Sequence, residues 1–390
     1  MVKTMAVNLT LDSNAPDDAE KADASQTGEK PLSTMDKINN YLLRFTRIPL
    51  KEKLFFVQHL GLMLKSGISL STALKTLSQQ TKNKNFISVL NDVASRVEKG
   101  SSFAESLGAH KNIFGELFVS MVEAGEISGK LENVLAQLFI QMKKENTLIS
   151  KVKGALTYPA IILLAMLGIG AFMMVMIIPK MTAMFTEMNT ELPLPTKILI
   201  GVSNAIAKNG LVSAVVFVAF VIALFYALKT QRGKYIFQAI LLNAPIISPI
   251  VKKINLARFA RNISSLLKTD IMIIKAFQIT ANVLGNLHYR TALMEMSQKI
   301  KKGGKLSETV AAYPKLFTPV VTTMIAVGEE TGELDNILME LASFYEEEVD
   351  LIMDNLPSII EPLLILFLGT GVGGVAVAII MPMYSITESI

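Results

Sequence analysis

Long apolar stretches are the strongest pattern along this chain. Three of them run for twenty residues or more without a single charged side chain. A helix needs about 20 mostly apolar residues to cross a bilayer, and each stretch satisfies this length. We therefore predict three transmembrane helices, at residues 154–179, 209–228 and 360–383.

The chain also contains an internal repeat. Residues from Phe56 to Phe185 align without a gap on the residues from Phe259 onward, and each matched pair is 203 positions apart. Matched pairs occur in polar and apolar segments alike; they include Lys65 with Lys268, Glu105 with Glu308, Phe114 with Phe317, Pro159 with Pro362 and Pro179 with Pro382. One offset over so long a segment indicates a duplicated unit. We call residues 56–185 copy one and residues 259–388 copy two.

Each copy begins with a segment in which apolar residues recur at helical spacing, as in Phe55, Leu60, Met63 and Leu64. Almost no alternating strand pattern is present. Glycine-containing breaks around Gly67, Gly100 and Gly129 divide this segment into helices of ordinary length. The predicted fold class is an all-α membrane protein with two homologous cytoplasmic antiparallel helical bundles plus three transmembrane helices.

The topology follows from the repeat and the basic residues. Two bundles on one face, each followed by an outgoing helix, need one returning helix, and residues 209–228 have no partner in the repeat. Lys229, Arg232 and Lys234 follow this helix directly, which places both bundles in the cytoplasm by the positive-inside rule. The expected organisation is a disordered acidic N-terminal tail (1–40), a first cytoplasmic bundle (41–152), a first span (154–179), a periplasmic loop (180–208), a second span (209–228), a second cytoplasmic bundle (229–355), a third span (360–383) and a periplasmic C-terminus (384–390).

Composition narrows the chemistry. The chain is 51% hydrophobic and only 18% charged, which agrees with a membrane protein. It has no cysteine and three histidines, so thiolate nucleophiles, disulfides and iron–sulfur clusters are excluded. The net charge of +5 comes without a basic run interleaved with aromatic residues, so no direct nucleic-acid contact is expected. We expect no catalytic residue, no cofactor and no metal site.

At this point the residues resemble a known family. The stretches "MVEAGEISGKLENVLAQL" from Met121 and "MIAVGEETGELDNILMEL" from Met324, with "FFVQHLGLMLKSGISLSTALKTL" from Phe55 and its counterpart from Ile254, look like the duplicated domain of the type II secretion system F and type IV pilus inner-membrane platform family. The resemblance covers about residues 45 to 388. Ser69 stands where the family usually has proline, and Asp270 stands where it usually has glycine.

The resemblance implies a function and partners. It implies an inner-membrane platform on which a cytoplasmic hexameric ATPase acts while pilin or pseudopilin subunits leave the bilayer. Other inner-membrane assembly proteins and a homo-oligomer are further implied partners, beside the lipid bilayer itself. Pilus, secretion and DNA-uptake machines all remain open.

Two Gly-Glu-x-x-Gly motifs at the same offset are the first candidate site; their residues are Gly125, Glu126, Gly129, Gly328, Glu329 and Gly332. In copy one, Gly125 fits a glycine with positive φ at a helix end, and Gly129 marks a second turn. The two glutamates are expected near the amino end of the next helix, whose dipole favours anions. Caps and turns explain every residue of the motif; the alternative is a docking surface for the ATPase or a partner scaffold.

The starts of the first and third spans are the second candidate site. Pro159 and Pro362 occupy matched positions there, and Glu361 precedes the second proline. A carboxylate inside a membrane suggests function because its burial is costly. Glu361 either reaches the membrane interface or pairs with a positive group of an incoming pilin helix. Further along, Gly369 and Gly373 form a small-x-x-x-small face that fits either another copy or the chain's own helices.

Three classes of function compete. An enzyme needs a nucleophile, base or metal constellation, and no phosphate-binding loop or His-Glu-x-x-His motif is present. A secondary transporter needs ionisable residues or broken helices near the middle of the membrane, with more than three spans. A platform needs large bundles, few spans and no catalytic chemistry, and the sequence fits this class best. The alternative is a membrane scaffold or transporter subunit unrelated to fibre assembly.

Overall fold

The computed structural model describes residues 48–187, 193–208, 210–245 and 247–388, which all belong to one compact unit, Arg47–Ile390. The predicted N-terminal tail (1–40) lies outside the described residues, as does part of the predicted loop (180–208). Every regular element in the described residues is helical, and none of them is a strand. The all-α fold class is thereby confirmed.

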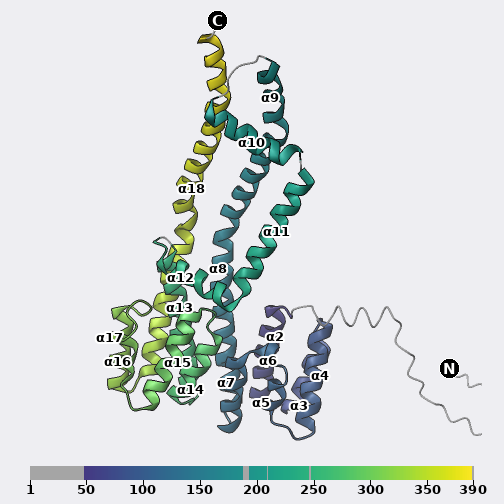
Figure 1. Ribbon diagram of the computed structural model, residues 1–390. Coiled ribbons are helices and arrows are strands. Elements are labelled where there is room, and N and C mark those ends of the chain that lie inside the picture. The colour runs from purple at the N-terminus through teal and green to yellow at the C-terminus, as the bar shows by residue number, and fades with distance from the viewer. Residues whose placement is uncertain (1–47, 188–192, 209, 246, 389–390) are drawn as a thin grey trace, which may run out of the picture. The chain divides into compact units, whose positions relative to one another are not determined.

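Copy one starts with six short helices and a long one (Figure 1). They are α2 (Leu50–Lys65), α3 (Leu70–Gln80), α4 (Lys84–Glu98), α5 (Phe103–Gly108), α6 (Lys111–Phe114), α7 (Glu116–Ile127) and α8 (Leu131–Phe172). Polar residues begin several of them: the side chains of Ser69, Asn83 and Ser102 accept backbone N–H groups of the first turns of α3, α4 and α5. Such caps satisfy N–H groups that have no partner inside the helix.

Copy two repeats this arrangement with α13 (Ser248–Leu267), α14 (Ile273–Val283), α15 (Leu287–Lys301), α16 (Leu306–Ala311), α17 (Pro319–Thr331) and α18 (Leu334–Glu388). The two cores correspond residue by residue. In copy one the ring of Phe56 lies 5.6 Å from that of Phe86 and 5.9 Å from that of Phe114. In copy two, 203 positions later, Phe317 lies 5.1 Å from Phe259 and 5.6 Å from Tyr289. The duplication is therefore present in the structure as well as in the sequence.

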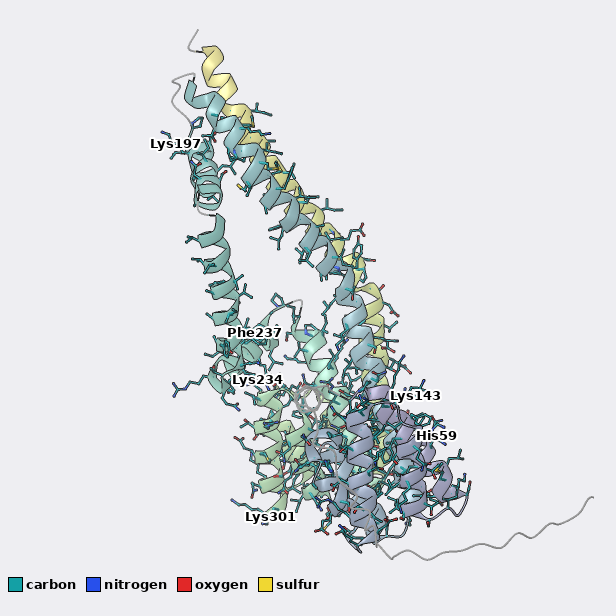
Figure 2. All side chains as sticks on the ribbon, turned by 90° about the vertical axis from the view of Figure 1, so that its right-hand side faces the viewer. His59, Lys143, Lys197, Lys234, Phe237 and Lys301 are labelled. Carbon is teal, nitrogen blue, oxygen red and sulfur yellow. The ribbon has the colours of Figure 1, made fainter. Side chains whose placement is uncertain are left out.

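The last bundle helix of each copy continues into the membrane segment without a break. Residues Leu131–Ala183 and Leu334–Ala378 are long and apolar enough to cross a membrane. The predicted boundary between the first bundle (41–152) and the first span (154–179) falls inside α8. A charged residue interrupts an apolar stretch, but it does not end a helix. Figures 1 and 2 show α8 and α18 rising side by side from the bundles.

The predicted second span coincides with α11 (Gly210–Lys229), a helix of 20 residues. That α11 crosses the membrane remains a prediction, because the apolar helical segment identified within it, Val218–Lys229, is shorter than a full span. The helix that follows, α12 (Gln231–Asn243), exposes Phe237, while Lys234 marks its basic start (Figure 2). A bend of 109° separates α12 from α13.

Part of the predicted loop at residues 180–208 is helical. It forms the end of α9 (Ile178–Glu187) and the whole of α10 (Leu194–Lys208). The Thr196 hydroxyl donates to the carbonyl oxygen of Ala378 at 2.6 Å, and the Ser203 hydroxyl donates to that of Met174 at 2.5 Å. Met174 lies in a π-helical turn, η1 (Met173–Ile177), where the backbone carbonyls are displaced from their ordinary helical partners. These bonds attach α10 to α18 and to η1, the turn that directly follows α8.

The glycine face of the third predicted span has no partner in the described residues. A Cβ atom added at Gly369, Gly371, Gly373 or Gly374 would meet nothing within 4 Å. Of the two alternatives for this face, packing against the chain's own helices is therefore not observed at these positions.

The turn that follows the first helix of each copy keeps its shape despite the unusual residue in copy two. Gly67 has a φ of +80°, and its counterpart Asp270 has a φ of +60°. Asp270 is the only described residue other than glycine with a positive φ. Aspartate tolerates this region better than most residues, at some cost relative to glycine.

Replacing Asp270 by glycine should stabilise the chain by up to about 1 kcal/mol, because the strained φ is relieved. The ion pair that Asp270 makes with Lys130 at 3.5 Å is exposed and contributes little. The matched change Gly67→Asp should destabilise by a similar amount. Thermal midpoints of both variants in detergent test this prediction, and shifts of the same sign would contradict it.

Candidate functional site: the paired Gly-Glu motifs and the contact between the copies

The Glu126 carboxylate caps a helix that precedes it in the sequence. It accepts the backbone N–H of Phe103 at 2.7 Å and that of Ala104 at 2.9 Å, the first two residues of α5. Ser102 accepts the N–H of Glu105 at 3.1 Å. Three free N–H groups of the first turn are thus satisfied. The expected attraction to a helix amino end is correct, but the expected helix is wrong: the carboxylate caps α5 and not the following α8.

Glu329 makes the same contact in copy two. It accepts the N–H of Leu306 at 2.7 Å and that of Ser307 at 3.0 Å, at the start of α16. The side chain of Lys305, which precedes this helix, provides no cap, so Glu329 supplies the capping there. Glu329 is mostly exposed, and its slight desolvation raises its pKa. The bonds from Leu306 and Ser307 and the nearby Lys305 charge outweigh this effect and leave the pKa of Glu329 below its usual range.

The first glycine of each motif allows two helices to pack closely. A Cβ on Gly125 would lie 2.7 Å from Cγ2 of Val134, and a Cβ on Gly328 would lie 3.0 Å from Cα of Leu334. Gly125 lies inside α7 with a helical backbone, so the expectation of a positive φ there is wrong. The left-handed residues are the second glycines, Gly129 with a φ of +68° and Gly332 with a φ of +76°.

Each motif therefore joins three helices: α5, α7 and α8 in copy one, and α16, α17 and α18 in copy two. Its glutamate fastens the short helix, and its first glycine fits against the long helix that leads toward the membrane. Within the motif of copy one, the apolar side chain of Ile127 faces outward and is 82% exposed. An exposed apolar side chain beside a rigid turn suits partner contact, and the sequence pattern alone did not single it out.

Replacing Glu329 by glutamine should destabilise α16 by about 0.5–1 kcal/mol, in the lower part of the range for lost helix caps, because this residue is solvent-exposed. The amides of Leu306 and Ser307 should exchange faster with deuterium. Because folding lowers the pKa of Glu329, the ionised carboxylate should stabilise the folded state at pH values above the unfolded pKa of about 4.3. This stabilisation should fade as the pH falls below that value. Hydrogen exchange at pH 7 and pH 4 measures both effects. If these two amides exchange equally fast at pH 7 in the wild-type protein and in the Glu329→Gln variant, the prediction is contradicted.

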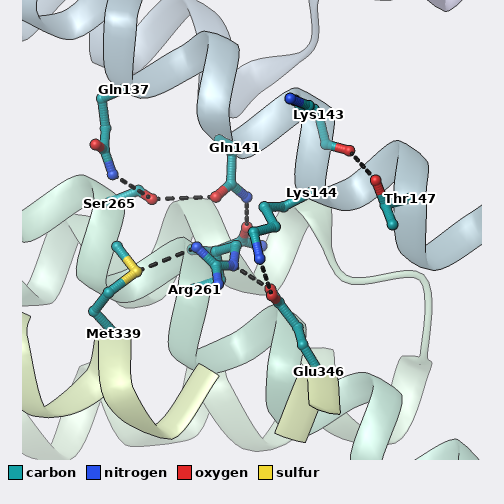
Figure 3. Close-up of polar contacts among 10 residues, drawn as sticks. Gln137, Gln141, Lys143, Lys144, Thr147, Arg261, Ser265, Met339 and Glu346 are labelled. Atoms are coloured by element: carbon teal, nitrogen blue, oxygen red, sulfur yellow. Dashed lines mark hydrogen bonds and ion pairs between the residues drawn. The ribbon is translucent and has the colours of Figure 1, made fainter. Parts of the chain in front are cut away.

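A buried polar network joins the two copies, and sequence reasoning did not predict it (Figure 3). Gln141 of α8 donates to the Asn262 side chain of α13 at 2.6 Å and accepts from the Ser265 hydroxyl at 3.1 Å. Gln137 donates to Ser265 at 3.3 Å. Gln141, Asn262 and Ser265 are all buried. Such a network fixes one relative position of the two helices, because any slip leaves buried polar groups without partners.

An ion-pair cluster lies beside this network. Arg261, which is 5% exposed, pairs through Nε with Glu346 of α18 and donates from its other side to the Met339 sulfur at 3.2 Å. Lys144 of α8 approaches the second oxygen of Glu346 at 3.4 Å. Glu346 is thus shared by both copies (Figure 3). A buried charge of this kind is stable only while its partner remains.

The span-start residues lie apart from the motifs. Pro159 is buried inside α8, whereas Glu361 and Pro362 are exposed on α18. The structure does not bring Glu361 together with the Gly-Glu motifs. Just before these positions the two long helices contact each other, through the Lys151–Asp350 ion pair at 2.5 Å and a cluster around Met353.

Comparison with known proteins identifies the repeat. The family model for "Type II secretion system (T2SS), protein F" matches twice, at residues 56–179 and 259–382, which are offset by the same 203 positions. The chain is similar to the type IV pilus assembly protein PilC of Thermus thermophilus (36% identical, 86% of this chain and 83% of the relative) and to PilC of Myxococcus xanthus (34%, 87% and 81%). It is also similar to the type II secretion system protein F of Aeromonas hydrophila (28%, 90% and 90%). The chain therefore belongs to the type II secretion system protein F family.

Proposed function

We propose that this protein is an inner-membrane platform of a type IV pilus or type II secretion machine, with no catalytic activity of its own. The observation that carries the proposal is the twofold family match over both copies. Two helices of sufficient length and apolarity to cross a membrane support a membrane location. The relatives at 36% and 34% identity are named as pilus assembly proteins, whereas relatives named protein F are 28% and 29% identical. This difference favours the pilus machine.

The platform would couple a cytoplasmic hexameric ATPase to pilin or pseudopilin polymerisation. The long helices α8 and α18 support this coupling, because each continues from a bundle into a membrane segment. A continuous helix of 42 residues such as α8 is about 63 Å long and connects the bundle directly with the membrane segment. Work applied to a bundle would therefore reach the membrane segment that meets the subunits.

The proposed topology places both bundles in the cytoplasm, with three spans at residues 154–179, 209–228 and 360–383. Lys229 at the end of α11 and Arg232 and Lys234 in the first turn of α12 support this orientation. In this topology the paired Gly-Glu motifs lie on the side of the ATPase, and Ile127 offers it an exposed apolar contact. Glu361 would lie at the start of the third span, where it can meet a positive group of an incoming subunit.

A charge-reversal scan of the exposed bundle residues tests this coupling. Lys99 and Lys302 make a matched first pair, since they occupy equivalent exposed turns of the two copies. We expect reversals on the ATPase-facing surface to reduce both ATPase recovery and surface fibres, while the platform stays in the membrane at normal amounts. ATPase recovery and fibre assembly that survive reversal across both bundles would contradict the coupling.

A further inference from the structure

The contact between the copies is built from two different faces. One face belongs to α7 and α8 of copy one, and the other belongs to α13, α14 and one side of α18 of copy two. Beside the buried network, Glu145 pairs with Arg258 at 2.6 Å and Glu123 pairs with Lys275 at 3.1 Å. A contact between unlike faces leaves one face of each kind unused in every duplicated chain.

The unused face of copy one lies on α2 and on the turn before α3. Leu62 is 61% exposed, whereas its counterpart Ser265 is fully buried. Ile68 is 38% exposed, whereas its counterpart Ile271 is 7% exposed. The same positions of the repeated fold are therefore covered in copy two and open in copy one.

The unused face of copy two lies on α17 and α18. Phe344 is 48% exposed, whereas its counterpart Gln141 is 6% exposed. Val320 and Val327 on α17 are also exposed, at 53% and 42%. Their counterparts in copy one, Leu117 and Ala124, are partly buried against the hydrophobic core.

The two open faces carry matching apolar side chains at the centre of the repeated contact. Where the covered contact has Gln141 against Ser265, the open faces have Phe344 and Leu62. The polar pair inside the chain is thus replaced by an apolar pair, and the change occurs on both sides. Exposed apolar rows that correspond to a covered surface indicate a missing partner.

We propose that a second copy of this chain covers these faces, with Phe344 of one chain packed against Leu62 of the next. The contact repeats, between chains, the arrangement that α8 and α13 make within the chain. Because α8 and α18 rise together from the bundles (Figure 1), this repetition keeps the long helices of both chains parallel in one membrane. The contact is heterologous, so each chain uses one face toward each of two neighbours.

This inference rests on the proposed platform function, and it assigns a surface to the homo-oligomer that the family resemblance implies. Its test does not depend on fibres, so its failure and the failure of the proposed function are distinguishable. The chain has no cysteine, so introduced cysteines react without background. One full-length version carries Leu62→Cys and a first tag, another carries Phe344→Cys and a second tag, and both are co-expressed in membranes and treated with a short bismaleimide.

We expect a cross-linked product that carries both tags. The control pair Lys84→Cys with Phe344→Cys should give none, because the exposed Lys84 begins α4, at the opposite end of α3 from Ile68. Adding Val327→Glu to the Phe344→Cys chain should lower the yield at least about tenfold, as expected for a charge placed in a packed contact. The exposed site of Val327 makes misfolding an inadequate explanation for that loss.

Three results would overturn the proposal. The first is the absence of a product with both tags, including the case in which Phe344→Cys reacts with a different protein instead. The second is a product that joins Leu62→Cys only to another Leu62→Cys, which would indicate a contact between like faces. The third is a yield that Val327→Glu leaves unchanged.

Discussion

Replacing Glu346 by leucine should destabilise the chain by about 3–5 kcal/mol, the largest effect that we expect from a single substitution. The change leaves the Arg261 guanidinium buried at 5% exposure, with the Met339 sulfur as its remaining hydrogen-bond partner among the described residues. A buried cation without its counter-charge bears the full cost of desolvation. The Glu346→Leu change also removes the carboxylate that pairs with Lys144 of α8.

Replacing the other partner of this ion pair, Arg261, supplies the control. Arg261→Met should cost less, because Glu346 is more exposed than Arg261 and keeps Lys144 at 3.4 Å. The double variant Arg261→Met with Glu346→Leu should be more stable than Glu346→Leu alone, since no charge is then stranded. Thermal midpoints of the three variants in detergent give the order. A double variant that is no more stable than Glu346→Leu would show that charge burial is not the cause.

Replacing Gly328 by alanine should destabilise the chain by about 1–3 kcal/mol, the range for overpacking a close contact. The added Cβ would lie 3.0 Å from the backbone Cα of Leu334 and 3.4 Å from Cβ of Ile337. Backbone atoms cannot rotate away as a side chain can, so α17 must move off α18. The effect has the opposite sign to the gain of about 1 kcal/mol that alanine normally gives over glycine in a helix.

Gly154→Ala is the matched control for this prediction. Gly154 also lies inside a helix, α8, and a Cβ there would meet nothing within 4 Å. We expect this variant to be unchanged or slightly stabilised in the same thermal assay. Equal shifts for Gly154→Ala and Gly328→Ala would contradict the packing role of Gly328.

Much of the fold could be predicted from local pattern. The apolar stretches and the helical spacing depend on neighbouring residues, so the all-α class and the first and third span candidates follow from them. The repeat added long-range information, because one offset ties Phe56 to Phe259 and Phe114 to Phe317. These residues indeed occupy equivalent places in the two cores.

The remainder depends on contacts between distant residues. No local pattern shows that Glu126 caps the earlier helix α5, because the 23 positions between Glu126 and Phe103 give no periodic signal. The role of Gly125 was mistaken for the same reason, since its close neighbour Val134 lies on another helix. The continuity of α8 was missed because charged residues end a hydropathy window, whereas the helix passes through them.

The network between the copies was also beyond sequence reasoning. Gln141 and Asn262 are polar residues of types that are mostly exposed in proteins, and their burial becomes visible only when α8 and α13 are placed together. The repeat even misleads here, because the counterparts Phe344 and His59 have different chemistry. Comparing matched positions by exposure reveals which faces are covered in one copy alone.

The most direct test of the central claim is to delete the gene in its host, restore it with a tagged copy, and image surface fibres while identifying the proteins that co-purify from solubilised membranes. A platform predicts that fibres or secretion disappear on deletion and return with the tagged copy, and that an assembly ATPase and pilin-like subunits are recovered with it. Fibres and secretion that persist in the deletion strain, with neither partner recovered, would contradict the account.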